Sequence, residues 1–311
     1  MTDKMTNSTP EGAKMKESLK AYTDLTRIHF FFVWPALFSS GLMLAFKVYG
    51  DFSWLLAVKA VLIAFFGFEA GFILNDYVDR EVDKKDVDDR PTRYWRPFNE
   101  RPIPSGFITP KRALMLFFVF IIIAAALVST LPYPHNVYVY VIGIYCYSME
   151  YFYQIKKRNQ TFPWAQLLGR TDFSLFPIAG YLCYGHPDKI ALLYFLFFYP
   201  LALAHLGIND MTDVRNDEAK DLKTIPVLYG MRKTALWVAF FVGLHYATSL
   251  LFLWELHSLL LAGFSVGFLL LGVAAYKLVK EESPETALGV LPLLHVSMLI
   301  YAVSFIIYSV F

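Results

Sequence analysis

The chain has 311 residues, of which 57% are hydrophobic, 18% aromatic and only 17% charged, and its mean hydropathy is +0.45. This composition is too apolar for an ordinary soluble domain and predicts a membrane protein. The net charge of +2 comes from 28 basic and 26 acidic residues, which gather in blocks between long apolar runs. Cys146 and Cys183 are the only cysteines, and both lie within apolar runs, which argues against a disulfide framework and a thiolate metal site.

The first 27 residues are polar and lack the apolar segment and small-residue cleavage site of a signal peptide. We therefore expect a cytosolic N-terminal tail, 1–27, with an interfacial helix. The remainder, 28–311, is expected to form a single transmembrane domain. Its two halves, about 28–153 and 163–278, are expected to be weakly repeated and to be followed by a last helix, because a span in each half ends in Asn-Asp before a charged loop.

Helices that cross a membrane need about 20 mostly apolar residues. Nine runs fit this description, which predicts an all-α polytopic membrane protein with nine transmembrane helices. Long charged loops follow the second and the sixth run. The predicted spans are 28–46, 52–74, 113–130, 137–152, 163–183, 190–208, 234–253, 256–278 and 287–311.

The placement of positive charge gives the predicted orientation. Most of the 28 Lys and Arg residues lie in the tail, in the loops after the second, fourth and sixth spans, and at the end of the eighth span. Because short cytosolic segments carry an excess of Lys and Arg, we expect a cytosolic N-terminus and an external C-terminus. Both long loops would then face the cytosol.

The first loop begins with an acidic motif, Asn75-Asp76-Tyr77-Val78-Asp79-Arg80-Glu81-Val82-Asp83. If the second span continues as a helix, Asp76, Asp79 and Asp83 lie at i, i+3 and i+7 and share one face. Three like charges on one face favour a bound cation. Mg²⁺ is the expected ion because it prefers oxygen ligands and shares its coordination with waters and substrate phosphates.

The second loop repeats this arrangement. After Asn209, the residues Asp210, Asp213 and Asp217 again lie at i, i+3 and i+7, and Asp221 follows one turn later. One such cluster alone is often only a solvated helix face. Two copies at the same end of the membrane predict one shared site, in which two metal clusters hold a diphosphate and nearby Lys and Arg complete the neutralisation.

These motifs resemble those of the UbiA superfamily of intramembrane prenyltransferases. The stretch 75–83 resembles the family's NDxxDxxxD motif, and 213–217 resembles its second motif, DxxxD. The stretches 101–106 (RPIPSG) and 222–227 (LKTIPV) resemble further family signatures. The resemblance covers nearly the whole chain. It implies a helical bundle around a central cavity that opens sideways to lipid and is capped on the cytosolic side by the two motif loops.

The resemblance also implies roles for individual residues. Asn75, Asp79, Asp83, Asp213 and Asp217 would bind Mg²⁺ and diphosphate, and Asp76 and Asp210 complete the candidate metal ligands. The candidates for substrate binding are Asn75, Arg80, Lys156, Lys157, Asn209 and Lys223.

Three departures from the family pattern stand out. The stretch before Arg101 is long and rich in Arg and Pro, and no role is predicted for it. Glu150 lies where many members have a different sequence, in the region that borders the acceptor, and is the candidate for contacting the acceptor or taking its proton. Asp221 stands where a small residue is expected, and its role is also open.

The predicted activity is Mg²⁺-dependent transfer of a polyprenyl group from an allylic diphosphate to a lipophilic or aromatic acceptor, either a quinone precursor or a glycerol-phosphate ether lipid. Loss of diphosphate leaves a carbocation-like species, so the site must stabilise the leaving group and exclude water. Aromatic faces can stabilise the cation. Two alternatives stay open: a terpene cyclase of the same fold, and a cation or lipid transporter. A transporter would need polar groups through the full membrane depth.

Overall fold

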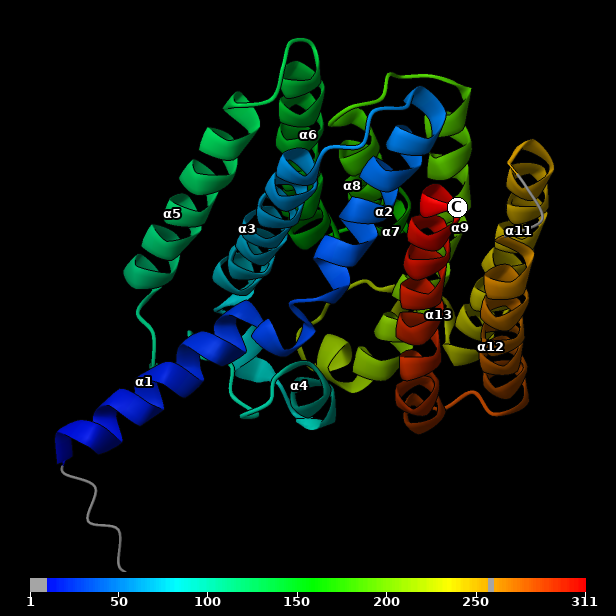
Figure 1. Ribbon diagram of the computed structural model, residues 1–311. Coiled ribbons are helices and arrows are strands. Elements are labelled where there is room, and N and C mark those ends of the chain that lie inside the picture. Colours follow the sequence, from blue (N-terminus) through cyan, green and yellow to red (C-terminus); the bar gives the residue numbers. More distant parts are fainter. Residues whose placement is uncertain (1–9, 257–259) are drawn as a thin grey trace, which may run out of the picture.

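The computed structural model describes residues 10–256 and 260–311, and these residues form helices without strands (Figure 1). Two short 3-10 helices, η1 (Ile28–Phe30) and η2 (Asp83–Lys85), complete the pattern. The α-helices are α1 (Pro10–Thr26), α2 (Val33–Tyr49), α3 (Trp54–Asp79), α4 (Arg90–Trp95), α5 (Pro110–Ser129), α6 (His135–Lys156), α7 (Trp164–Gly169), α8 (Thr171–Leu182), α9 (Lys189–Ala219), α10 (Ile225–Tyr229), α11 (Met231–Glu255), α12 (Leu261–Lys280) and α13 (Pro284–Val310).

Local sequence explains where several long helices begin. The side chains of Ser53, Thr109, Asp188 and Ser283 each accept a hydrogen bond from the backbone N–H three residues later, which caps α3, α5, α9 and α13. Proline follows the cap at the start of α5 and α13, where its missing N–H costs nothing.

Seven helical segments within the described residues are long and apolar enough to cross a membrane. They are α2 together with η1, and α3, α5, α9, α11, α12 and α13. The two other predicted spans correspond to α6 and to the pair α7 and α8. The predicted span 163–183 is broken at Arg170, which leaves α8 with 12 residues. At about 1.5 Å per residue, α8 alone is about 18 Å long, well short of the roughly 30 Å of a bilayer core.

The long helices pack side by side, with α9 against α11, α3 against α5, and α12 against α13. The largest core cluster joins α2, α8, α9, α11, α12 and α13. Helices α2 and α8 approach closely because Gly41 and Gly180 have no side chains. A Cβ at Gly180 would lie 1.9 Å from the Phe38 carbonyl oxygen, and one at Gly41 would lie 2.0 Å from that of Pro177.

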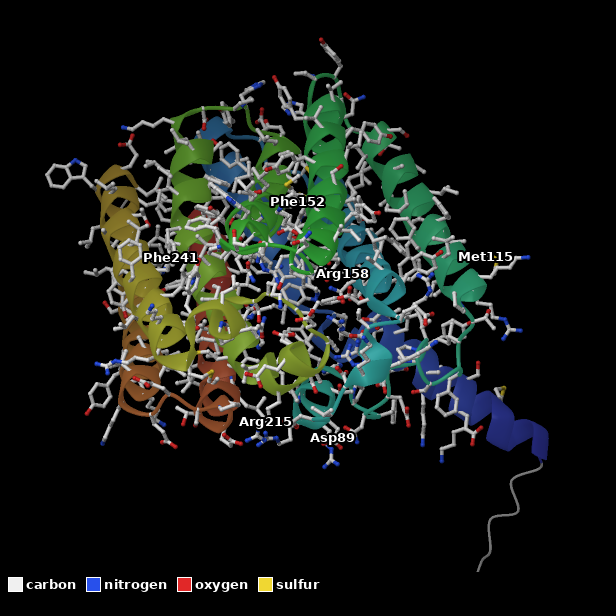
Figure 2. The ribbon with its side chains drawn as sticks, turned by 180° about the vertical axis from the view of Figure 1, so that it is seen from behind. Asp89, Met115, Phe152, Arg158, Arg215 and Phe241 are labelled. Carbon is white, nitrogen blue, oxygen red and sulfur yellow. The ribbon has the colours of Figure 1, made fainter. Side chains whose placement is uncertain are left out.

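Helix α4 lies at one end of the bundle, which we call the cap end, and α1 projects from the same end (Figure 1). Helix α13 begins at the cap end, and the C-terminus lies away from it. Viewed from behind, Asp89 and Arg215 lie at the cap end, whereas Arg158 lies further into the bundle (Figure 2). The predicted helix of the tail is present as α1, whereas 1–9 lie outside the described residues. The start of the predicted span 256–278 includes 257–259, which also lie outside them.

Candidate active site

Both acidic motifs line one polar cavity of about 190 Å³ toward the cap end, between the ends of α3 and α9. The motif residues that line it are Asn75, Asp79, Asp83, Asn209, Asp210, Asp213 and Asp217. The sequence separation between the motifs exceeds a hundred residues, so only the packing of the bundle brings them together. The arrangement agrees with the expectation of one shared site.

Asp79 ends α3 and is buried between two basic residues from the end of α6. Its Oδ2 accepts a hydrogen bond from Lys157 Nζ at 2.7 Å, and its Oδ1 accepts one from Arg158 at 2.9 Å. Burial alone lowers the pKa of the Lys157 ammonium group, but the ion pair with Asp79 outweighs burial and raises that pKa above its usual value. Lys157 is therefore a fixed positive charge on the wall of the cavity.

Helix α3 continues past Leu74 as far as Asp79, but Asp83 lies beyond it, at the start of η2, so the three carboxylates do not share one helix face. Asp83 instead pairs with Arg101 at 2.5 Å and with Lys220 at 2.8 Å. Burial raises the pKa of Asp83, but these two cations outweigh it and lower the pKa to about 2.

Asp76, a predicted metal ligand, does not line the cavity in the described structure. Both of its oxygens accept hydrogen bonds from Arg96, at 2.8 and 2.9 Å, and Oδ1 also pairs with Arg27 at 2.8 Å. Because two guanidinium groups already neutralise this buried carboxylate, the structure favours a structural role for Asp76. Through Arg27 it binds the tail to α3, and through Arg96 it binds the Arg-Pro-rich stretch before Arg101, which we call the insert.

The second motif lies within α9, as the sequence predicts, and its carboxylates have different partners from those of the first motif. Asp210 accepts from Gln166 at 3.0 Å, and Asp217 accepts from Thr224 at 2.8 Å. Asp213 has a long contact of 3.5 Å with Asn216. Among the described residues none of these three carboxylates forms an ion pair. The wall formed by α9 therefore presents carboxylates whose oxygens are not occupied by ion pairs within the described part of the chain.

This donor set fits Mg²⁺. No three acidic, histidine or cysteine side chains in the described parts of the chain lie close enough together to form a metal cluster by themselves. Mg²⁺ usually takes only one or two carboxylates and completes its coordination with waters and substrate phosphates. The carboxylates of α9 supply such hard oxygen donors, and the cavity leaves room beside them.

Several predicted substrate-binding residues lie elsewhere. The guanidinium of Arg80 donates to the Tyr77 carbonyl oxygen at 2.6 Å and stacks on the Tyr77 ring, and it does not line the polar cavity. Lys156 also lies outside the polar cavity, whereas its neighbour Lys157 lines it. Lys223 pairs at 2.5 Å with Asp221, which is exposed and has a φ of 57°. The side chain of Asp221 thus points away from the site.

The Arg-Pro-rich insert forms the roof of the polar cavity. Pro91 and Thr92 of α4, together with Trp95 and Arg96, line it. A buried chain of hydrogen bonds ties α4 to the bundle, from Tyr94 to His295 at 2.7 Å and from His295 to His205 at 2.8 Å. His205 lines the same cavity. The structure thus places the insert against the site, a position that the sequence did not predict.

A second cavity, of about 320 Å³ and mostly apolar, lies among α3, α5, α6 and α8. Glu150 lines it, and Glu150 Oε1 accepts hydrogen bonds from Asn75 at 3.0 Å and from Gln154 at 2.5 Å. The two cavities adjoin, because six residues line both of them. These residues are Arg27, Phe68, Phe72, Asn75, Arg170 and Phe173.

Aromatic rings and two arginines mark this junction. Trp34 stacks on Phe68 with ring centroids 4.0 Å apart, and the guanidinium of Arg27 lies 4.3 Å from the Phe72 ring. Arg170 lies over the Tyr153 ring, and its Nε is buried without a hydrogen-bond partner among the described residues. The junction can therefore accommodate both a charged group and an apolar one.

Sequence reasoning missed the cavity residues Arg27, Arg96, Arg101 and Lys220. Arg27 belongs to the predicted tail, and Arg96 belongs to the insert, for which the sequence predicts no role. Lys220 lies one residue beyond α9 and reaches across to Asp83. For Arg96, Arg101 and Lys220 the available signal was charge complementarity, since they follow the acidic motifs in the sequence. Arg27 gave no such signal, and the partners of all four residues depend on tertiary packing.

Comparison with known proteins agrees with this geometry. Residues 32–307 match the model of the UbiA prenyltransferase family. A digeranylgeranylglyceryl phosphate synthase of Thermococcus kodakarensis is 28% identical over 81% of this chain and 85% of its own length. A 4-hydroxybenzoate octaprenyltransferase of Vibrio atlanticus is 27% identical over 76% of this chain and 82% of its own.

Solved structures show the same fold. A UbiA homologue from Archaeoglobus fulgidus, bound to DMAPP and Mg²⁺, superimposes with a TM-score of 0.67 at 17% sequence identity. The superposition covers 92% of this chain and 98% of that one. The family match, the long apolar helices and the shared fold together identify an integral, multi-pass membrane protein. The chain belongs to the UbiA prenyltransferase family, and it is a prenyltransferase.

Proposed function

We propose that the protein catalyses Mg²⁺-dependent transfer of a polyprenyl group from a polyprenyl diphosphate to a lipophilic or aromatic acceptor, with release of diphosphate. The observation that carries this proposal is the junction of two cavities, one polar and lined by both acidic motifs, the other apolar. An amphiphile with a highly charged head and an apolar chain fits such a junction. The UbiA homologue from Archaeoglobus fulgidus named above is bound to such a diphosphate, DMAPP, together with Mg²⁺.

The polar cavity would hold the diphosphate. Mg²⁺ bound there would supply positive charge that stabilises the leaving group. Asp213 and Asp217 on α9, with Asp79, Asp83, Asn75, Asn209 and Asp210, would hold the metal. Lys157, Arg101 and Lys220 line the same cavity and would contact the diphosphate oxygens. We do not assign this role to Arg80, Lys156 or Lys223, because their side chains lie elsewhere.

The apolar cavity would hold the prenyl chain and exclude water from the reacting carbon. Phe68, Phe72 and Phe173 line the junction, where the bond to diphosphate would break. Their ring faces would stabilise positive charge at that carbon. Glu150 lies beside Asn75, at the boundary of head and chain, and would accept the proton that the acceptor loses on alkylation.

The finer membrane topology belongs to the same proposal. We infer that α6 and the broken pair α7 and α8 complete nine spans, that the N-terminus and the cap end face the cytosol, and that the C-terminus is external. An odd number of spans agrees with α1 and the C-terminus lying toward different ends of the bundle (Figure 1). Cysteine labelling from each side of sealed vesicles would test this orientation.

Diphosphate release tests the activity. Purified protein is incubated with Mg²⁺, labelled geranylgeranyl diphosphate, and either 4-hydroxybenzoate or a geranylgeranylglyceryl phosphate as acceptor. We expect release of diphosphate and a prenylated product with one of these acceptors, and no release in the presence of EDTA. Asp217→Ala and Asp79→Ala should fold, insert and lack activity. Release with a cyclic hydrocarbon product and no acceptor would instead identify a cyclase.

A further inference from the structure

Two histidines from different helices meet beside the polar cavity. His205 of α9 and His295 of α13 are separated by 90 residues in the sequence, and their Nε2 atoms lie 2.8 Å apart. Both side chains are buried. A hydrogen bond between two ring nitrogens needs one protonated and one unprotonated nitrogen, so only one of the two Nε2 atoms carries a proton. The other contacts of the pair decide which atom this is.

The hydroxyl of Tyr94, in the insert, sets the direction of this hydrogen bond. It lies 2.7 Å from Nδ1 of His295, and within the described residues that nitrogen is its only hydrogen-bond partner. The hydroxyl therefore donates to Nδ1, because in the reverse arrangement its own proton would have no acceptor there. His295 then carries its proton on Nε2 and donates to Nε2 of His205. The rings of Phe30 and Trp95 pack against that of His295, with centroids 5.8 and 5.1 Å away, and hold it in place.

The position of the proton on His205 follows from this chain. Because Nε2 of His205 accepts, the ring carries its proton on Nδ1. Nδ1 has no hydrogen-bond partner among the described residues, and it is not one of the partnerless polar atoms that are fully enclosed, as Nδ1 of His29 is. His205 lines the polar cavity. An N–H donor without a partner is thus open to that cavity.

The surroundings of this N–H favour the diphosphate as its partner. A protonated ring nitrogen has no free lone pair, so Nδ1 cannot bind Mg²⁺ and needs a hydrogen-bond acceptor. The ring of His205 lies nearly parallel to that of Phe173, with 6.1 Å between centroids and 19° between planes. Phe173 lines the junction of the two cavities, where the bond to diphosphate would break. Diphosphate oxygens near that bond are the acceptors that the proposed donor would bring there.

We propose that His205 donates a hydrogen bond from Nδ1 to the diphosphate in the polar cavity, and that Tyr94 and His295 are positioning residues that keep the proton on this nitrogen. The inference rests on the proposed function and adds a residue to its diphosphate site. Tyr94 belongs to the insert that roofs the cavity. The insert therefore acts on the site through this chain of hydrogen bonds as well as by covering it.

The position of the proton can be measured directly. NMR of protein with ¹⁵N in its histidine rings separates protonated from unprotonated ring nitrogens, and the loss of signals in His205→Gln assigns those of His205. We expect the wild type to carry the His205 proton on Nδ1. In Tyr94→Phe, His295 loses the donor that fixes its proton, so both tautomers of His205 should appear. A wild-type His205 protonated on Nε2 would overturn the inference.

Binding of inorganic diphosphate with Mg²⁺ tests the role of the N–H. An asparagine side chain offers an N–H near the place of Nδ1, whereas glutamine offers one near the place of Nε2. His205→Gln should raise the Kd by about tenfold or more, because a hydrogen bond to a charged group is lost. His205→Asn should raise the Kd less. Unchanged affinity in His205→Gln, or equal loss in the two variants, would contradict the proposed hydrogen bond.

Tyr94→Phe provides a second test that leaves the cavity lining intact, because Tyr94 does not line the polar cavity. It should raise the Kd for diphosphate in the wild type and should have no further effect in His205→Gln. The same variant keeps the inference testable if a His205 variant fails to fold. Wild-type affinity in Tyr94→Phe, together with an unchanged His205 tautomer, would show that the insert does not position the proton.

Tyr301→Phe is the matched control. It removes the hydroxyl from another buried tyrosine and histidine pair, in which Tyr301 Oη lies 3.1 Å from His245 Nε2, and neither residue lines the polar cavity. It should leave the proton of His205 and the affinity for diphosphate unchanged. A wild-type protein that binds neither diphosphate with Mg²⁺ nor a prenyl thiolodiphosphate would instead refute the proposed function.

Discussion

The side-chain amide of Asn216 holds the backbone of Asp88 at two points. Its Oδ1 accepts from the Asp88 N–H at 2.8 Å, and its Nδ2 donates to the Asp88 carbonyl oxygen at 2.9 Å. The same Oδ1 accepts from the Val87 N–H at 2.9 Å. Asn216 lies between Asp213 and Asp217 on α9, so the second motif both lines the polar cavity and anchors the insert that covers it.

Asn216→Ala should therefore loosen the insert. The change removes three hydrogen bonds to the backbone of Val87 and Asp88, each of which contributes about 0.5 to 1.5 kcal/mol. Amide hydrogen exchange across 86–96 should accelerate, and diphosphate release should fall. Glu218→Ala, an exposed substitution on the same helix, is the control. Unchanged exchange in Asn216→Ala would show that other contacts hold the insert.

Lys157 and Lys156 are adjacent in the sequence but differ in what they face. Lys157→Gln removes a cation from the wall of the polar cavity and should weaken binding of diphosphate with Mg²⁺ by about tenfold or more. Lys156→Gln should leave binding unchanged. Calorimetric titration of both variants measures the difference. An equal loss of affinity in the two variants would contradict the assignment of Lys157, and not Lys156, to the diphosphate site.

The sequence predicted the parts of this site that depend on local spacing. Asp210, Asp213 and Asp217 lie within one helix, so helical periodicity alone was enough to place them. Asp76 and Asp83 show why the rest could not be predicted. Their directions are set by Arg96 and Lys220, which come from the insert and from the end of α9. Pairing between residues so far apart in the sequence follows from packing and not from periodicity.

The fold shows the same contrast between features that follow from local sequence and features that follow from packing. Apolar runs predicted the positions of the long helices, because burial in lipid requires such runs. The break at Arg170 was not predicted. Its surrounding sequence is apolar enough to read as one span. In the structure the break instead turns Arg170 toward the junction of the two cavities.

Gly180→Ala should destabilise the bundle. The added Cβ would lie 1.9 Å from the Phe38 carbonyl oxygen, so α2 and α8 would have to move apart. Overpacking of this kind costs about 1 to 3 kcal/mol or more. Thermal unfolding in detergent should show a lower Tm than for the wild type. Gly289→Ala, where the Cβ meets nothing within 4 Å, should not lower the Tm.

The attachment of the insert should depend on pH through Asp88. Hydrogen bonds from Arg90 lower the pKa of Asp88 to about 2, below its usual value near 3.8. A depressed pKa stabilises the folded arrangement above the usual value, and this stabilisation is lost as the pH falls from about 4 toward 2. Limited proteolysis of the insert should therefore accelerate over that range in the wild type. In Asp88→Asn cleavage should already be faster at pH 7 and should change less with acid.

Glu150→Gln should separate donor binding from transfer. The substitution keeps an oxygen that can accept from Asn75 and removes the charge that would take the proton of the acceptor. Binding of an unreactive prenyl thiolodiphosphate should stay within about twofold of the wild type, since the proposed place of the donor head is the polar cavity, which Glu150 does not line. Loss of a general base lowers the rate by about a hundredfold or more, so single-turnover transfer should slow by that amount. Glu150→Asp, which restores a carboxylate, should recover part of the rate. Full turnover in Glu150→Gln would exclude Glu150 as the base and would leave proton release to the acceptor's own chemistry.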